Sequence, residues 1–249
     1  MNIIKKIITG KQDNIVLHIN TQLKYPEDFY NYLDVKLFYS SEDFNKAFKS
    51  TQLIDLFGKD STNIFFCLIP NDYKVLWAAS PKVIVDSVLQ WHDRYWTKNR
   101  IQLAERIGLS IPEIITLASI VQSESLIFSE RQKIARVYLN RIKSNMPLQA
   151  DPTLIFANRL KGVKRILDID KKINSPYNTY INTGLPPGPI SLTYTTSIES
   201  VLNADSNNYL FFCAKPERNG YSNFSSTYNE HLKHAKNYQT ALNKQKIFR

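Results

Sequence analysis

The sequence predicts an α+β protein made of a small N-terminal unit and a larger, mainly helical domain with a small β-sheet. The first 72 residues follow a strand, helix, helix, strand pattern, and helical apolar spacing dominates residues 73–249. Hydrophobic residues make up 43% of the 249 residues, which is enough to form a packed core. We therefore expect two folded parts with a border near residue 72.

The N-terminal unit, residues 1–72, contains four predicted elements. Alternating apolar and polar side chains at residues 15–20 predict a half-buried strand. Two short helices follow, one opened by Pro26 and one by Ser40. The segment 63–69, in which every residue after Asn63 is apolar, predicts the second strand. This βααβ outline fits a LysM-like carbohydrate-binding module, and it also fits many other small domains.

Two segments of the larger domain have the pattern of a capping box. In this motif the Ser side chain accepts a hydrogen bond from the backbone N–H three residues later, and the acid or amide side chain there accepts one from the backbone N–H of the Ser. Ser110-Ile111-Pro112-Glu113 predicts a helix that begins at Ile111. Ser129-Glu130-Arg131-Gln132 predicts a second helix start in the same way. Two further helices are expected before them, one from Ser80-Pro81 and one from Asn99 to Gly108.

The part of the chain after residue 145 differs in composition from the helices before it. Residues 146–190 are rich in turn signals, and a long ordered loop of this kind is typical of a functional site. The remaining pattern predicts a helix near 193–203, strands at 208–214 and 222–226, and a closing helix to about Lys244.

The charge balance restricts the class of partner. With 32 Lys and Arg against 22 Asp and Glu, the formal charge is +10, which favours an anionic partner such as nucleic acid, a membrane face or a cell-wall polymer. The basic residues are spread along the chain instead of clustered, which speaks against nucleic acid. Cys67 and Cys213 lie in apolar runs and are expected to be buried small hydrophobes.

Glu124 is the first candidate for chemistry. It continues a stripe of apolar residues on the helix predicted from Ile111, so its carboxyl is directed towards the core side. Burial without a cation raises the pKa of a carboxyl, which is the condition for a general acid near neutral pH. The alternative is that the helix ends near Glu124 and its head group reaches solvent.

Several segments, in order along the chain, resemble the successive motifs of the endolytic murein transglycosylases, the MltG or YceG-like family. These segments are Leu117 to Glu124, Tyr138 to Arg141, Met146 to Thr153, Ser175 to Tyr180 and Gly184 to Ile190. The resemblance implies cleavage of the β-1,4 bond between N-acetylmuramic acid and N-acetylglucosamine without water, leaving a 1,6-anhydro end. It also implies a LysM-like N-terminal unit.

The resemblance assigns the catalytic acid to Glu124. Many members carry a second Glu two positions earlier, where this chain has Gln122, so Glu124 is the only acid in the motif. A glycoside hydrolase normally needs two carboxylates. A lytic transglycosylase can use one, because the sugar's own 6-hydroxyl is the nucleophile and is already close to the reacting carbon.

Other residues in these motifs are candidate substrate contacts. Tyr177, Asn178 and Tyr180 offer hydroxyl, amide and aromatic groups suited to a sugar, and the alternative is a loop packed on itself. Gln149 and Asp151 are expected in the cleft, although Asp151 could instead cap the helix that begins near Pro152.

Asn140 could orient Glu124 or satisfy a nearby loop, and the sequence leaves both readings open. His231 and His234 are three residues apart, but no Glu or Cys completes a metal ligand set, so a surface helix is expected there. Neither a metal nor a cofactor is predicted.

The resemblance further implies peptidoglycan glycan strands as substrate, peptidoglycan synthases as partners, and a location in the bacterial cell envelope on the outer side of the cytoplasmic membrane. It implies an N-terminal membrane anchor, which we do not find as a run of about 20 apolar residues in this sequence. The competing hypothesis is a non-catalytic peptidoglycan-binding scaffold protein.

Overall fold

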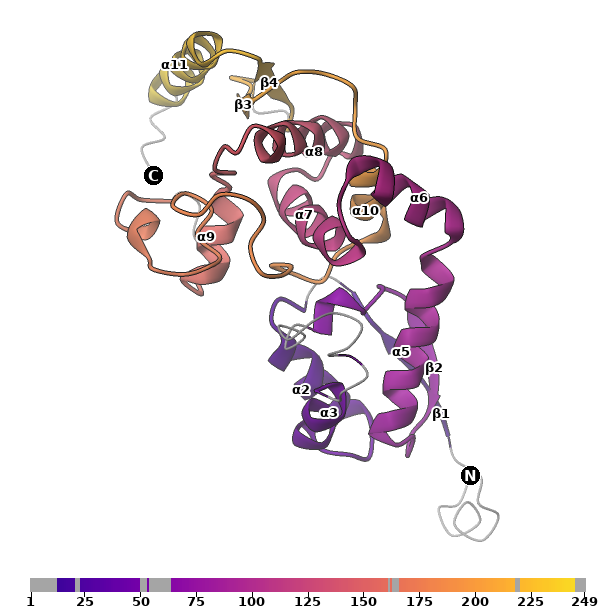
Figure 1. Cartoon of the computed structure of the whole chain (residues 1–249). Helices are drawn as coiled ribbons and strands as arrows, with labels where there is room; N and C mark the ends of the chain where they lie inside the picture. Colours follow the sequence, from indigo (N-terminus) through magenta and orange to yellow (C-terminus); the bar gives the residue numbers. More distant parts are fainter. Residues whose placement is uncertain are drawn as a thin grey trace, which may run out of the picture. The chain divides into compact units, whose positions relative to one another are not determined.

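The structure, a computed structural model, describes residues 13–20, 23–49, 53, 64–160, 162, 166–217 and 220–244. It divides into two compact units, Met1–Asn99 and Arg100–Arg249, which we describe in turn (Figure 1). Helices predominate among the described residues, and each unit contains one two-stranded antiparallel sheet. The predicted α+β class is confirmed.

The first unit pairs its first and last strands around two helices. Strand β1 (Asn14–His18) runs antiparallel to β2 (Asp72–Leu76), with Asn14 opposite Leu76. Between the strands come α2 (Pro26–Lys36), α3 (Ser41–Phe48) and the 3₁₀ turn η1 (Ile64–Phe66), and α5 (Pro81–Tyr95) follows β2. The buried rings of Phe29 and Phe48 meet edge to face, 5.5 Å apart, and join α2 to α3. The predicted order of strand, helix, helix and strand is found.

The second strand is not where the apolar run predicted it. Residue 63 lies outside the described residues, and residues 64–69 form η1 and a following irregular stretch. All six are buried, so the run marks a buried segment and not the alternating pattern of a half-buried strand. That alternation occurs in β2, where Tyr73 and Val75 are buried between exposed neighbours.

The border between the units also differs from the expected one. The predicted border after residue 72 falls at the first residue of β2, whereas the compact units divide between Asn99 and Arg100. The reason is that β2 pairs with β1 and α5 packs against α3, so both belong with the N-terminal elements.

The second unit is built around one central helix. It contains α7 (Ile111–Glu124), α8 (Phe128–Lys143), α10 (Thr195–Leu202) and, from Arg100 onward, α6 (Lys98–Ile107). Helices α7, α8 and α10 contact one another (Figure 1). Residues 114–121 of α7 are all buried, as expected for a helix enclosed on every side. This burial fixes the position of the helix end, and therefore of Glu124.

The capping boxes had different outcomes. At α7 the backbone N–H of Ser110 donates to the Glu113 carboxylate at 2.8 Å, and the helix begins at Ile111 as predicted. Helix α8 begins at Phe128 with Ile127 as N-cap, so the box predicted from Ser129 is wrong. The Gln132 amide instead donates to the carbonyl of Asn203 and ties α8 to the end of α10.

The segment from 146 to 190 contains α9 (Asp151–Ala157) and the 3₁₀ turn η2 (Asp170–Lys172), and is otherwise irregular where it is described. It is joined to itself by hydrogen bonds: Gln149 N–H donates to Thr179 O at 3.0 Å, and Ala150 N–H donates to the Thr179 hydroxyl at 3.0 Å. Where it is described, the segment is therefore the ordered loop that the sequence predicts, with a short helix inside it.

Strands β3 (Phe211–Ala214) and β4 (Ser222–Ser225) and helix α11 (Tyr228–Lys244) are the last described elements. The positions of β4 and α11 agree with the prediction, whereas β3 begins at Phe211, three residues later than expected. Within the part of the chain that the structure describes, we find no helix of the length and apolarity needed to span a membrane.

Candidate active site

Glu124 is the last residue of α7, and its side chain is partly buried. Its Oε1 accepts a hydrogen bond from the Tyr138 hydroxyl at 2.6 Å. Because α7 packs along α8, two residues that are 14 positions apart in the sequence are brought into contact. The alternative in which the Glu124 head group extends freely into solvent is not what the structure shows.

The surroundings of Glu124 change its acidity. Burial raises the pKa of its carboxyl to about 7, and the negative charge of Asp151 adds to this rise. The hydrogen bond from Tyr138 and the positive charge of Arg141 oppose it. A carboxyl with such a pKa is present in both protonated and ionised forms near neutral pH, so it can give up a proton and take one back.

Tyr138 keeps its own proton in this setting. Its side chain is buried, and burial together with the neighbouring Glu124 raises its pKa well above the ordinary value for tyrosine. The ring meets Phe212 of β3 edge to face at 5.9 Å, which holds the hydroxyl in position. Tyr138 is thus a fixed hydrogen-bond donor to Glu124.

Replacing Tyr138 by Phe tests this role. The Tyr138 hydrogen bond lowers the pKa of Glu124, so its loss should raise that pKa further. If Glu124 acts as the acid, activity is lost as the pH rises and Glu124 ionises. In the Tyr138→Phe protein this loss should occur at a higher pH than in the wild-type protein. The measurement is the pH profile of glycan cleavage, and an unchanged profile with an unchanged thermal midpoint would contradict the role.

Arg141 lies beside this pair and links α8 by hydrogen bonds to residues 147–148 and to Leu210. Its side chain is buried, its Nε donates to the carbonyl of Leu210 at 2.7 Å, and its Nη1 donates to the carbonyls of Leu148 at 2.7 Å and Pro147 at 3.3 Å. The planar guanidinium suits several acceptors at fixed angles. Arg141 therefore holds the segment around Leu148 and the start of β3 against α8.

These groups open into a pocket of about 270 Å³. It is lined by residues of α7, α8, α11, β3 and the 146–190 segment: Glu124, Tyr138, Arg141, Leu148, Gln149, Asp151, Tyr180, Phe212 and His231. Four residues expected from the sequence are brought together here, namely Glu124, Gln149, Asp151 and Tyr180.

Asp151 and Tyr180 form a second acid and hydroxyl pair in the pocket, with the Tyr180 hydroxyl donating to Asp151 Oδ1 at 2.5 Å. Asp151 is the first residue of α9, and Ala150 is the N-cap, so the alternative in which Asp151 caps the helix is not found. Lys171 lies over the Tyr180 ring at 5.5 Å.

Tyr177 and Asn178 do not line the pocket. Asn178 is fully buried, and its amide donates to the carbonyls of Lys171 and Ile173, both at 2.9 Å. Its Oδ1 accepts from the backbone of Tyr180 at 3.0 Å. The Tyr177 ring packs on Phe156 at 4.8 Å. For these two residues the structure agrees with the packed-loop alternative, in which Asn178 positions Tyr180.

Asn140 is likewise not among the residues that line this pocket. Its amide donates to the carbonyls of Asn207 and Tyr209 at 3.0 and 2.9 Å. Of the two readings left open by the sequence, the one in which Asn140 satisfies a loop agrees with these contacts.

Gln122 has a structural role that explains why an amide can stand at this position. Its Nε2 donates to Leu192 O at 3.0 Å, and its Oε1 accepts from the backbone of Tyr194 at 2.7 Å and from the Ser197 hydroxyl at 3.0 Å. The side chain uses donor and acceptor ends to join α7 to the start of α10. Glu124 remains the one acid that α7 contributes to the pocket, which Asp151 also lines.

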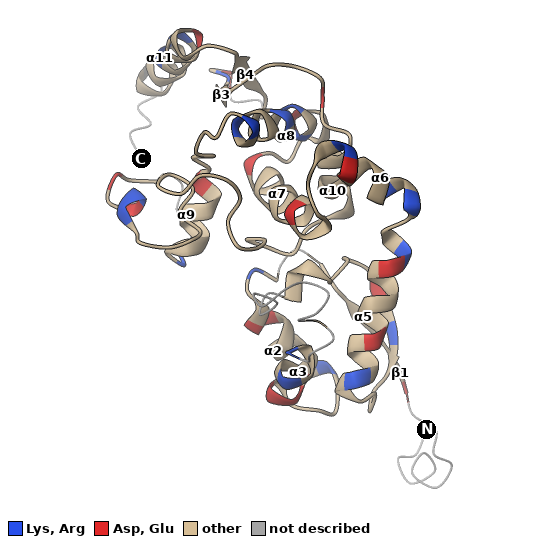
Figure 2. Cartoon of the chain, in the orientation of Figure 1, with Lys and Arg blue, Asp and Glu red and all other residues tan. Residues whose placement is uncertain are grey.

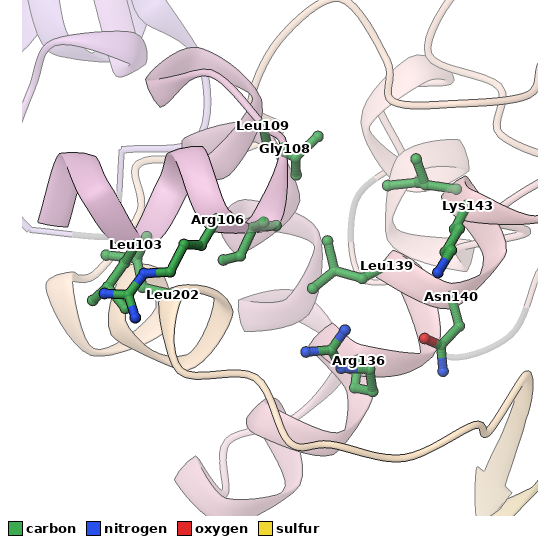
Figure 3. Close-up of a pocket in the computed structure, with 11 residues that line it drawn as sticks. Leu103, Arg106, Gly108, Leu109, Arg136, Leu139, Asn140, Lys143 and Leu202 are labelled. Atoms are coloured by element: carbon green, nitrogen blue, oxygen red, sulfur yellow. The ribbon is translucent and has the colours of Figure 1, made fainter.

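A larger pocket of about 590 Å³ lies between α6, α8 and the end of α10, shown in Figure 3. Its lining includes Arg106, Arg136 and Lys143 and contains neither Asp nor Glu. A general acid is therefore missing from this pocket, so we place the candidate active site in the smaller one. Figure 2 shows Lys and Arg on several helices, including α5, α6 and α8, without one dominant cluster.

Sequence reasoning missed roles for Tyr138, Arg141 and His231. The first two lie in a motif that carried the resemblance, and their spacing of three residues places them on one face of α8. His231 was expected on a surface helix, yet it lines the pocket. Within the described residues, no group of three His, Cys, Asp or Glu side chains could hold a metal ion.

Comparison with known sequences decides the family. The sequence profile of the YceG-like family matches residues 1–237. The chain belongs to the YceG-like family. A crystal structure described as that of a yceG-like protein from Listeria monocytogenes has a similar fold, with a TM-score of 0.71 and 27% identity, over 93% of this chain and 80% of that one.

Two relatives of this YceG-like chain carry a named activity. A protein named endolytic murein transglycosylase from Bacillus subtilis is 43% identical over 135 residues, which is 54% of this chain and 37% of the relative. A protein of the same name from Streptococcus pneumoniae is 30% identical over 151 residues, which is 59% of this chain and 27% of the relative. The aligned regions thus cover 37% of the first relative and 27% of the second.

Proposed function

We propose that the chain is an endolytic peptidoglycan transglycosylase, a lyase that cleaves the N-acetylmuramic acid to N-acetylglucosamine β-1,4 bond of glycan strands and leaves a 1,6-anhydro end. The observation that carries the proposal is Glu124, whose carboxyl has a pKa raised to about 7 and lines a pocket in a YceG-like chain. Two relatives named endolytic murein transglycosylase support it.

In the first step, protonated Glu124 gives its proton to the glycosidic oxygen as the bond to C1 breaks. An oxocarbenium-like state forms on the sugar, and Glu124 is left as a carboxylate. The Tyr138 hydrogen bond to Oε1 favours this ionised form. The carboxylate and the oxocarbenium carry opposite charges, so each stabilises the other in the pocket.

In the second step, the 6-hydroxyl of the same sugar attacks C1, and Glu124 takes the hydroxyl proton. The new C1–O6 bond closes the anhydro ring, and Glu124 returns to its protonated state without consuming water. One acid is sufficient because the nucleophile belongs to the substrate.

Asp151 and Tyr180 are the remaining expected substrate contacts in the pocket, together with Gln149. Asp151 also has an electrostatic role, because its negative charge raises the pKa of Glu124. We assign the N-terminal elements, expected as a LysM-like unit at residues 1–72, to glycan binding. The proposed location is the outer side of the cytoplasmic membrane, where strand termination would accompany the peptidoglycan synthases.

Incubation with murein sacculi or nascent glycan strands tests the proposal. We expect soluble or shortened strands that end in 1,6-anhydro-muramic acid, identified by mass spectrometry. Binding to sacculi without any cleavage would instead support the alternative, a non-catalytic peptidoglycan-binding scaffold protein.

A further inference from the structure

His231 is a pocket residue that the mechanism above does not use. It lies in the first turns of α11, about a hundred residues after Glu124 in the chain, and lines the same pocket. Because α11 contacts β3, the fold brings this imidazole to the acid end of α7.

The ring is held by stacking. It lies 5.3 Å from the Phe211 ring at an angle of 22°, and Phe211 also carries the Arg141 guanidinium at 5.3 Å. Tyr228 contributes a second ring at 6.3 Å. Aromatic contacts therefore hold the imidazole ring in place.

The two ring nitrogens have different surroundings. Nδ1 is buried and has no hydrogen-bond partner among the described residues. Nε2 is then the nitrogen available to a ligand in the pocket. An unpartnered buried acceptor is tolerated better than an unpartnered buried N–H, so the neutral ring should carry its proton on Nε2.

The charge state supports the same assignment. Burial lowers the pKa of His231, and the positive charge of Arg141 and the neighbouring His234 lower it further. The imidazole is thus neutral at neutral pH, and its Nε2–H is a donor without a formal charge.

We propose that His231 is a substrate-binding residue that donates a hydrogen bond from Nε2 to an oxygen of the sugar held against Glu124. The acceptor is a hydroxyl or the acetamido carbonyl, since these are the polar groups of an N-acetylated sugar. This inference rests on the proposed function and adds a contact from the C-terminal helix to the substrate site.

Three variants test it. His231→Phe keeps a ring on Phe211 but removes both nitrogens, and we expect a roughly 2- to 10-fold loss in kcat/KM on glycan strands, the amount one hydrogen bond contributes. His231→Gln restores an amide N–H donor and should recover part of that loss. His234→Phe, the same exchange one turn away and outside the pocket lining, should match the wild-type protein.

A binding measurement distinguishes a substrate contact of His231 from a purely structural role. In the Glu124→Gln background, which prevents turnover, His231→Phe should weaken binding of peptide-free glycan strands by a similar factor while the thermal midpoint stays the same. Wild-type cleavage and binding in His231→Phe would overturn the proposal. No cleavage by the wild-type protein would instead overturn the proposed function, so the two failures are distinguishable.

Discussion

Glu124→Gln should reduce glycan cleavage by roughly 10²- to 10⁴-fold, the range that a positioned general acid and base contributes. The amide has nearly the same shape and can still accept the Tyr138 hydrogen bond, so the fold and the pocket should persist. It cannot donate a proton to the glycosidic oxygen or take one from the 6-hydroxyl. The measurement is the initial rate of anhydro product formation.

Glu113→Gln is the matched control for this variant. Glu113 is an exposed acid in the first turn of the same helix, and a Gln there can keep the capping contact with Ser110. We expect wild-type activity from it. Equal rates for the Glu124→Gln, Glu113→Gln and wild-type proteins would remove Glu124 from the mechanism.

Arg141→Met should lower the free energy of unfolding by about 3 kcal/mol or more. The substitution removes the donor to the buried carbonyl of Leu148 and to the partly buried carbonyls of Leu210 and Pro147. An unsatisfied polar group costs about 1–3 kcal/mol when it is buried, and less when water can reach it. Arg141→Lys should recover only part of this, because an ammonium group cannot reach acceptors in the fixed directions of a guanidinium. Urea unfolding measures both.

Lys143→Met on the same helix provides the comparison. Its side chain is exposed, and surface substitutions usually change stability by less than about 0.5 kcal/mol. If Arg141→Met were as stable as Lys143→Met, the three hydrogen bonds would not hold the loop and β3 against α8. Activity should fall along with stability in Arg141→Met, because Leu148 and Gln149 line the pocket.

Local sequence signals predicted the start of α7 and the direction of the Glu124 side chain towards the core. The reciprocal contact between Ser110 and Glu113 depends on residues three apart, so it can be read from the sequence. The apolar spacing that predicts a core-facing Glu124 also involves residues of one helix only. Both predictions needed no knowledge of distant contacts.

Other features depend on partners far apart in the chain. Tyr138 contributes to the site only because α8 packs on α7, and His231 only because α11 packs on β3. The same limit applies to Asn178, whose side chain was a candidate for sugar binding. Buried contacts with the carbonyls of Lys171 and Ile173 occupy its amide instead, and only the folded loop reveals them.

The two local errors have a common physical cause. The apolar run at 63–69 was predicted to be a strand, but apolarity alone does not separate a strand from another buried segment, and the chain forms a 3₁₀ turn there. Similarly, the pattern at Ser129 satisfies a capping box, yet α8 begins at Phe128, and the Gln132 amide bonds to Asn203 O. In both cases the local pattern alone did not determine the structure.

Cleavage of glycan strands in oxygen-18-labelled water tests the central claim most directly. If Glu124 passes its proton to the leaving oxygen and the 6-hydroxyl closes the ring, the new ends are 1,6-anhydro sugars without label. The Glu124→Gln protein should produce almost none of them under the same conditions. New reducing ends that contain the labelled oxygen would show that water is the nucleophile, and would contradict the transglycosylase mechanism.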